Sequence, residues 1–386
     1  MDAVDGRQSV MRWLQQNPDH RPDHVFAIGK AAASMMQAVI ESGRDFRSGL
    51  VITKEDKLPY TVQRDARIDV VLSSHPVPDA SSLAAGQALL SAIASTDEEA
   101  ELLFLISGGT SALVEVVREG ADLDMLQQVN RHLLASGKSI HQMNAWRKRF
   151  SRIKGGGLRA MLGQRPTTQL MISDVRGDDP AVIGSGLLSR NDAEAEADDL
   201  LDSLAANITE TPVSVDTVVA THIIATLDHA KQAAAACAHN DDLPCMLHEG
   251  FIEGDALEQG RAIAASLCSA EPGVHVFGGE TTVNLPPDPG MGGRNQAMAL
   301  AMSEVIVGEE LAILCAGTDG IDGNSRCAGA VVDGDTATQA SSKGFDIRAE
   351  LDAANSGAVL KACDDLFAPG ATNTNVMDLI IAYKPL

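Results

Sequence analysis

Basic and small residues gather where strands are expected to end and helices to begin. Lys30 follows Gly29 at the end of a buried apolar run, residues 24–29, and precedes an alanine-rich helix. The helix dipole disfavours a lysine at a helix start, so we interpret Lys30 as a cation that faces a bound anion at the carboxyl edge of a sheet. A surface lysine is the alternative interpretation.

A second strand-to-helix junction carries glycines and hydroxyl groups in the run LISGGTSAL. Its candidate phosphate-binding residues are Ser107, Gly108, Gly109, Thr110 and Ser111. Backbone N–H groups at such a junction bind phosphate, because the start of the helix attracts negative charge. The phosphate-loop pattern GxxxxGK[ST] does not occur in the sequence, and a tight turn that needs glycine explains the run about equally well.

Carboxylates follow the strand expected at residues 168–174. Asp174 and Asp178 lie with Arg176 in the run MISDVRGDDPAVIGSG, and Glu280 lies in FGGETT. Oxygen ligands of this kind suit Mg²⁺, so these carboxylates are candidate metal ligands. An ordinary Asp-Gly turn is the alternative for Asp178.

Four further residues are candidates for contact with a substrate. His75 lies on the proline-stiffened run SSHPVPD, where an imidazole can donate to a substrate oxygen or make a structural hydrogen bond. Arg294 in GMGGRNQ can clamp a carboxylate or phosphate, unless that glycine-rich run is only a surface turn. Asn295 beside it is a substrate-binding candidate, and Asp319 in GTDGIDGN is a candidate base.

The acidic composition excludes two classes of binding partner. The formal net charge of -23 repels phosphate backbones and anionic lipids, so nucleic acids and membranes are not expected partners. We interpret the basic stretch around Arg147, Lys148, Arg149 and Lys154 as a salt-bridged, solvated helix rather than a nucleic-acid patch.

The six cysteines form no CxxC pair, so reduced, buried thiols are expected. No apolar run reaches the roughly 18 residues that span a bilayer, and no signal sequence is visible, so we expect a cytoplasmic protein.

The elements that position these residues alternate between strand and helix. A chain of 386 residues favours two domains, and repeated strand–turn–helix units predict a parallel sheet covered by helices. We expect a helix over residues 111–117 and a strand pair over residues 273–285. The alternation restarts at residues 218–226 after an acidic stretch. We therefore expect domains at residues 1–210 and 211–386, both of the α/β class.

Several runs, in this order, resemble the glycerate 2-kinase family, which has also been labelled hydroxypyruvate reductase. They are GKAAASM, SSHPVPD, LISGGTSAL, KSIHQMNAWRKRFSRIKGG, SDVRGDDPAVIGSG, FGGETTV, GMGGRNQAMALA and GTDGIDGNSRCAGAVVDG. The resemblance implies a Rossmann-like, three-layer domain and a smaller C-terminal α/β domain called MOFRL, with the active site in the cleft between them. Thr110 and Arg176 depart from the family pattern, which usually has Gly and Pro at these positions.

The resemblance also implies ATP-dependent, Mg²⁺-dependent phosphorylation of D-glycerate at its 2-hydroxyl. Lys30 and Arg294 are then the basic active-site residues, and residues 107–111 hold the phosphates. Two alternatives stay open: a hydroxypyruvate reductase, and a module that binds a sugar acid or sugar phosphate without chemistry. The reductase would need a GxGxxG dinucleotide fingerprint, which the sequence lacks. The oligomeric state is open, with a homodimer as one option.

Overall fold

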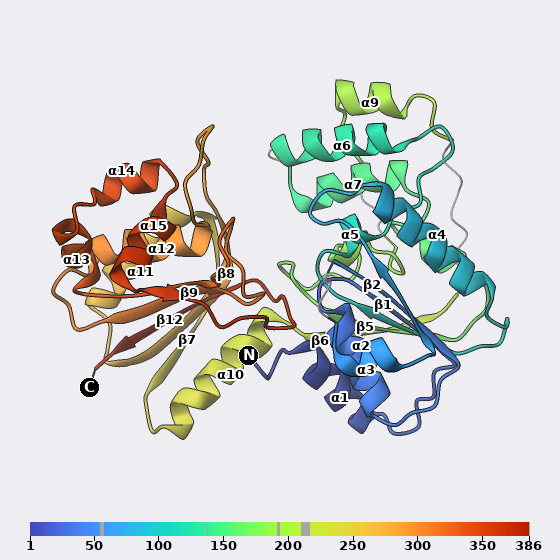
Figure 1. The fold of residues 1–386 in the computed structure, drawn as a ribbon, viewed down its shortest axis with the longest axis horizontal. Helices are drawn as coiled ribbons and strands as arrows, with labels where there is room; N and C mark the ends of the chain where they lie inside the picture. Colours follow the sequence, from blue (N-terminus) through green and yellow to red (C-terminus); the bar gives the residue numbers. More distant parts are fainter. Residues whose placement is uncertain (55–57, 137, 191–193, 210–216, 386) are drawn as a thin grey trace. The chain divides into compact units, whose positions relative to one another are not determined.

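The chain folds into two compact units. The computed structural model describes residues 1–54, 58–136, 138–190, 194–209 and 217–385. One unit is Asp5–Ala225, and the other is Thr226–Leu386 together with Met1–Val4 (Figure 1). The domain boundary expected at residues 210 and 211 falls outside the described residues, and the structure divides the chain after Ala225.

The first unit is built on a parallel sheet. Its strands are β1 (His24–Ile28), β2 (Ser48–Thr53), β3 (Ile68–Leu72), β4 (Leu102–Ile106), β5 (Thr167–Ile172) and β6 (Val219–Ala225). Their order is β3-β2-β1-β4-β5-β6, and every neighbouring pair is parallel. This is the doubly wound Rossmann order, in which the chain reverses direction across the sheet between β1 and β4. The Rossmann-like fold is therefore confirmed.

Helices cover both faces of this sheet. They are α1 (Gly6–Gln16), α2 (Ala32–Glu41), α3 (Tyr60–Arg64), α4 (Ala80–Ala94), α5 (Thr110–Leu113), α6 (Leu123–Ala135), α7 (Ile140–Phe150), α8 (Gly157–Ala160) and α9 (Asp199–Ala205), with a 3-10 turn at Ile183–Ser185. Helices α1 to α3 lie on one face and α4 on the other (Figure 1). Strands β1 and β4 are buried along their whole length because both faces are covered, and Phe26 stacks on Phe104 between them at 4.9 Å.

The second unit is built on a mixed sheet. Its strands are β7 (Cys245–Asp255), β8 (Gly273–Thr282), β9 (Ala312–Gly317), β10 (Gly329–Asp333), β11 (Leu366–Phe367) and β12 (Asp378–Lys384). The order is β11-β10-β9-β12-β8-β7, with β7 and β8 parallel and the other neighbours antiparallel. The α/β class expected for the C-terminal half is confirmed.

Alternate residues of the second sheet face different helices. The helices are α10 (Leu227–Asn240), α11 (Ala256–Cys268), α12 (Arg294–Val305), α13 (Thr336–Ser342), α14 (Ile347–Asp352) and α15 (Ser356–Cys363). Val276 belongs to the cluster with Ala238 of α10, whereas Phe277 belongs to the larger core with α11 and α12. Helix α12 is buried without a break over residues 295–303, so it forms the centre of that core.

The structure corrects four expectations. The strand expected to open the second half is β6, which pairs with β5 in the first sheet. The helix expected from Ser111 ends at Leu113, because the chain turns extended at Val114. The strand pair expected at residues 273–285 is the single strand β8. Among the thiols, Cys315 and Cys363 are buried but Cys237 is exposed, so uniform burial was wrong.

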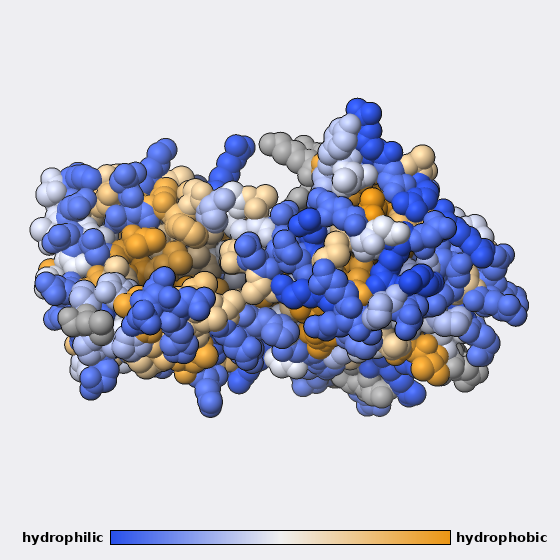
Figure 2. Space-filling model, turned by 90° about the horizontal axis from the view of Figure 1, so that it is seen from below, coloured by the Kyte–Doolittle hydropathy of each residue, from blue (hydrophilic) through white to orange (hydrophobic). Residues whose placement is uncertain are grey.

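The surface agrees with the acidic composition. The face drawn in Figure 2 is mainly hydrophilic, as expected for a chain with a net charge of -23. No helix in the described part of the chain has the length and apolarity to cross a membrane.

Candidate active site

The turns that follow β1 and β4 are joined at the point where the strand order reverses. Ser107 N donates to Ile28 O at 3.0 Å, Lys30 N donates to Gly108 O at 2.9 Å, and Ala31 N donates to Ser107 Oγ at 3.1 Å. The carboxyl ends of parallel strands beside such a reversal are the usual ligand site of this fold. Lys30 and the glycine-rich turn, residues 107–111, are therefore fixed at one edge of the sheet.

Gly29 makes this close approach feasible. Its φ is +130°, and a Cβ built there would lie 2.2 Å from Ser107 Oγ and 2.6 Å from Ser107 O. Any side chain would therefore overlap the second turn and adopt a backbone conformation that L-residues avoid.

Two side chains of the glycine-rich turn are structural. Ser107 and Thr110 are fully buried, and the Thr110 hydroxyl shares its one proton between Ile28 O at 2.9 Å and Ser107 O at 2.7 Å. Gly108 is also buried, whereas Gly109 and Ser111 keep partial exposure. Of the five candidate phosphate-binding residues, Gly109 and Ser111 are thus the ones that a ligand reaches.

His75 and Lys30 both approach Gly109 closely. A Cβ at Gly109, whose φ is +85°, would lie 3.0 Å from His75 Cδ2 and 3.2 Å from Lys30 Cγ. The three residues come from the turns after β3, β1 and β4 respectively. The structure therefore brings together three of the residues that the sequence singled out, from segments far apart in the chain.

Asp174 and Asp178 lie on the turn after β5, the neighbour of β4. Both are partly exposed, and Asp178 adopts a positive φ of 53°. In the ranges that the structure describes, no group of three or more His, Cys, Asp or Glu side chains is arranged to hold a metal ion. A metal at this turn would therefore need ligands besides protein carboxylates.

In the second unit, carboxylates surround Arg294. Its Nε lies 2.6 Å from Asp378 Oδ2 and its Nη2 lies 3.0 Å from Asp378 Oδ1, which is a bidentate pair. Nη2 also lies 3.0 Å from Glu280 Oε1. Burial alone would lower the pKa of Arg294, but the hydrogen bonds and charges of these carboxylates raise it overall. Arg294 is therefore a firmly charged cation at the start of α12.

Asn295 and Asp322 build the start of α12. Asp322 is buried and accepts hydrogen bonds from the backbone N–H of Asn295 at 3.0 Å and of Gln296 at 2.8 Å. Burial raises the pKa of Asp322 to about 6, although these two N–H groups oppose the shift. Asn295 is buried as well, and its side-chain amide lies 3.4 Å from Asp322 Oδ1. Asn295 thus helps to fix the helix start that carries Arg294.

Asp319 lies on the turn after β9. Its Oδ1 accepts from Ile321 N at 3.1 Å, and a Cβ at Gly317 would lie 3.4 Å from both Asp319 Oδ1 and Asp378 Oδ1. Sequence reasoning missed Asp378, which stands as the first residue of a strand without any motif around it.

Known proteins resemble the whole chain. Two family models match: a domain of unknown function, DUF4147, over residues 1–220, and the MOFRL family over residues 273–378. The D-glycerate 2-kinase of Thermotoga maritima is 34% identical over 376 residues, which is 92% of this chain and 89% of that protein. The chain belongs to the glycerate 2-kinase family.

Other members of the glycerate 2-kinase family agree in fold and differ in name. The crystal structure of glycerate kinase from Thermotoga maritima matches with a TM-score of 0.85 at 30% identity, covering 99% of this chain and 96% of that one. A protein of Agrobacterium vitis named putative hydroxypyruvate reductase is 36% identical over 401 residues, or 98% of this chain and 90% of that protein.

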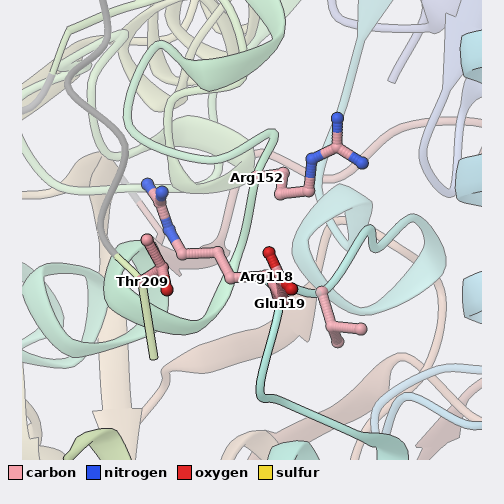
Figure 3. Close-up of a pocket in the computed structure, with 5 residues that line it drawn as sticks. Arg118, Glu119, Arg152 and Thr209 are labelled. Carbon is pink, nitrogen blue, oxygen red and sulfur yellow. The ribbon is translucent and has the colours of Figure 1, made fainter. Parts of the chain in front are cut away.

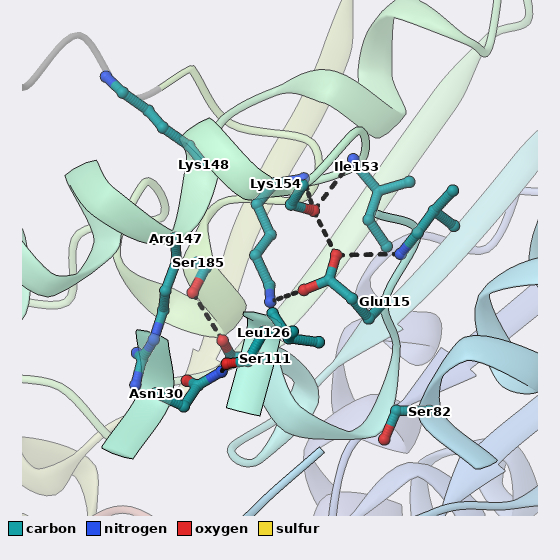
Figure 4. Close-up of polar contacts among 12 residues, drawn as sticks. Ser82, Ser111, Glu115, Leu126, Asn130, Arg147, Lys148, Ile153, Lys154 and Ser185 are labelled. Atoms are coloured by element: carbon teal, nitrogen blue, oxygen red, sulfur yellow. Dashed lines mark hydrogen bonds and ion pairs between the residues drawn. The ribbon is translucent and has the colours of Figure 1, made fainter. Parts of the chain in front are cut away.

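In this member of the family, part of the basic stretch after α6 is withdrawn from the solvated surface. Lys154 is buried and pairs with the buried carboxylate of Glu115, which also accepts from Ser151 Oγ at 2.5 Å (Figure 4). Burial lowers the pKa of Arg147, and its Nε has no hydrogen-bond partner in the described part of the chain. The expectation of a salt-bridged, solvated helix was wrong for these two residues, although Arg149 does pair with Asp202.

A pocket of about 350 Å³ also lies in the first unit. Its lining is Val117, Arg118, Glu119, Arg152 and Thr209, four of which are labelled in Figure 3. None of the candidate site residues lines it. The pocket is therefore not the candidate active site.

Proposed function

We propose that this protein transfers the γ-phosphoryl group of ATP to the 2-hydroxyl of D-glycerate. The observation that carries the proposal is the meeting of Lys30, His75 and Gly109 beside the strand-order reversal. That place binds ligands in open α/β sheets, and it is built here in a chain 34% identical to a D-glycerate 2-kinase.

Each residue at this edge has a task that phosphoryl transfer requires. The transferred group carries several negative charges, so catalysis depends on alignment and on positive groups that stabilise the transition state. We propose that the backbone at Gly109 faces the phosphates and that the Lys30 ammonium neutralises charge on the transferring group. We assign to His75, which also approaches Gly109, a hydrogen bond to a substrate oxygen.

Asp174 and Asp178 fit Mg²⁺ that enters with the nucleotide. Mg²⁺ is commonly held by one or two carboxylates together with phosphate oxygens and waters, so a three-ligand protein cluster is not needed. When bound, Mg²⁺ neutralises charge on the phosphates. Glu280 fits this role less well, because its carboxylate already pairs with Arg294.

Arg294 is proposed to hold the carboxylate of the acid. Asp378 is buried and binds Arg294 through two atoms, whereas the Glu280 side chain is 44% exposed and binds through one. Glu280 is thus the partner that a substrate carboxylate displaces. We keep Asp319 as the candidate base for the hydroxyl proton.

A coupled assay tests the proposed function. Purified protein is incubated with ATP, Mg²⁺ and D-glycerate, and the product is passed to enolase with and without phosphoglycerate mutase. We expect a signal without the mutase, because 2-phosphoglycerate is the substrate of enolase. A signal that requires the mutase would mean phosphorylation at the 3-hydroxyl, and no signal in either arm would refute the kinase function.

The reductase name among the relatives defines the second candidate. That activity would appear as NADH oxidation with hydroxypyruvate and no ATP, and its presence without ATP-dependent transfer would replace the kinase proposal. A binding module without chemistry would retain ligand and release no ADP. A cytoplasmic location and a homodimer remain predictions, which cell fractionation and light scattering test.

A further inference from the structure

Ser111 stands at the end of a buried line of hydrogen bonds. Its Oγ lies 2.8 Å from Ser185 Oγ, a contact drawn in Figure 4. Ser185 Oγ in turn lies 2.9 Å from Asn144 Oδ1, and Arg147 Nη1 lies 3.2 Å from the same Oδ1. Asn144 is 2% exposed and Ser185 is 3% exposed, so water does not replace these contacts.

The direction of every hydrogen bond in this line follows from Arg147. A guanidinium group only donates, so the Asn144 atom that faces it is the carbonyl oxygen. The amide nitrogen is fixed independently, because Asn144 Nδ2 donates to Val182 O at 3.3 Å. An amide oxygen only accepts, so Ser185 gives its single hydroxyl proton to Asn144. Ser111 must then donate its own proton to Ser185.

We propose that Ser111 Oγ faces the ligand only as a hydrogen-bond acceptor and accepts from a hydroxyl group of the acid that is phosphorylated. Its proton points into the protein, and its remaining lone pairs repel phosphate oxygens. Ser111 is partly exposed and lies two residues after Gly109. The inference rests on the proposed function, and it assigns Ser111 to the hydroxy acid, with the ATP phosphates left to the backbone and Lys30.

Arg147, Asn144 and Ser185 are positioning residues under this proposal. They touch no ligand, but they decide which way the Ser111 proton points. A purely structural role would lower stability without selecting between the two substrates. The KM values for the acid and for ATP therefore separate the two roles.

The first experiment replaces the acceptor. We expect Ser111→Ala to raise the KM for D-glycerate about five- to tenfold, the worth of one hydrogen bond, and to change the KM for ATP less than about twofold. Ser95→Ala is the matched control, because Ser95 is exposed and its hydroxyl donates to Ala92 O of its own helix at 2.7 Å. A rise in the KM for ATP with an unchanged KM for D-glycerate would overturn the inference while leaving the kinase function intact.

The second experiment removes the donor from the ligand. Dissociation constants for D-glycerate, D-lactate and 3-hydroxypropanoate are measured with wild type and Ser111→Ala, each in the presence of a non-hydrolysable ATP analogue. We expect the loss caused by Ser111→Ala to disappear for the acid that lacks the bonded hydroxyl. An equal loss for all three acids would contradict the proposal. Failure of the wild-type protein to phosphorylate D-glycerate with ATP in the coupled assay would instead refute the proposed function.

The third experiment compares two variants at one positioning residue. Asn144→Asp keeps an acceptor for both Arg147 and Ser185, so the Ser111 proton still points inward and the KM for D-glycerate stays near the wild-type value. Asn144→Leu removes the acceptor, so Ser185 can donate to Ser111 and the direction of their hydrogen bond can reverse. The KM for D-glycerate then rises about fivefold. Both variants lose the bond to Val182 O, and thermal melts report that shared loss. Equal KM values in the two variants would exclude the directional role.

Discussion

Gly29→Ala is expected to disrupt the junction that holds Lys30 against the glycine-rich turn. The new Cβ would lie 2.2 Å from Ser107 Oγ and 2.6 Å from Ser107 O, far inside ordinary van der Waals contact. The backbone φ of +130° also lies outside the regions that alanine populates, at a cost of about 1–3 kcal/mol. The overlap with Ser107 is relieved only if the turn after β1 moves away from the turn after β4.

The magnitude follows from the bonds that separation breaks. Ser107 N to Ile28 O and Ala31 N to Ser107 Oγ are each worth about 1 kcal/mol. Added to the backbone strain, the free energy of unfolding should fall by roughly 3–5 kcal/mol. Turnover should fall with it in any molecules that remain folded, because Lys30 moves away from Gly109.

The assay is chemical denaturation followed by fluorescence, with kinase activity measured on the same samples. Gly43→Ala is the matched control, since Gly43 has φ +70° but, among the described residues, no atom of another segment within 4 Å of its added Cβ. It should lose only about 1 kcal/mol, from the backbone term alone. Equal unfolding midpoints for Gly29→Ala and wild type would refute the steric reasoning.

Three further predictions concern charge. Glu115→Ala should lower the free energy of unfolding by about 3–5 kcal/mol, because it leaves the buried Lys154 without its carboxylate partner. Chemical denaturation measures this loss, and replacement of the exposed Glu119 by alanine is the control. A smaller loss in Glu115→Ala than in Glu119→Ala would contradict the prediction. The folded-state pKa of Asp322 is raised to about 6 from the ordinary 3.8, so its stabilising protonated form is lost as pH rises between these values. The free energy of unfolding should then fall by up to roughly 3 kcal/mol as pH rises across this interval. Thermal melts of Asp322→Asn should lack this pH dependence, and its persistence in that variant would assign the dependence to another group. Lys30→Met should lower kcat at least about a hundredfold with little change in the melting temperature, because Lys30 acts on the transferring charge; wild-type turnover would remove it from the mechanism.

The sequence predicted the first unit well because its signals are local. Apolar runs mark β1, β3 and β4, and each of these strands is followed by a helix, so a parallel sheet was the direct prediction. Lys30, His75 and Gly109 were recognised one at a time at strand ends. The fold then brings them together, since the carboxyl ends of parallel strands share one edge.

The remaining features depend on contacts between distant segments. The strand β6 looked like the start of a new domain, because nothing in its sequence shows that it pairs with β5. Lys154 looked like a surface lysine, because its partner Glu115 lies 39 residues away. Asp378 escaped notice for the same reason: its partner, Arg294, is 84 residues away in the chain.

Phosphorus NMR of a single reaction mixture tests the central claim most directly. The protein is incubated with Mg²⁺, ATP and D-glycerate, and the spectrum is followed with time. We expect the γ-phosphate signal of ATP to decline while the phosphomonoester signal of 2-phosphoglycerate grows in equal amount, and both changes to fail with Lys30→Met. Release of inorganic phosphate alone, or growth of 2-phosphoglycerate at the wild-type rate in the Lys30→Met sample, would contradict the account.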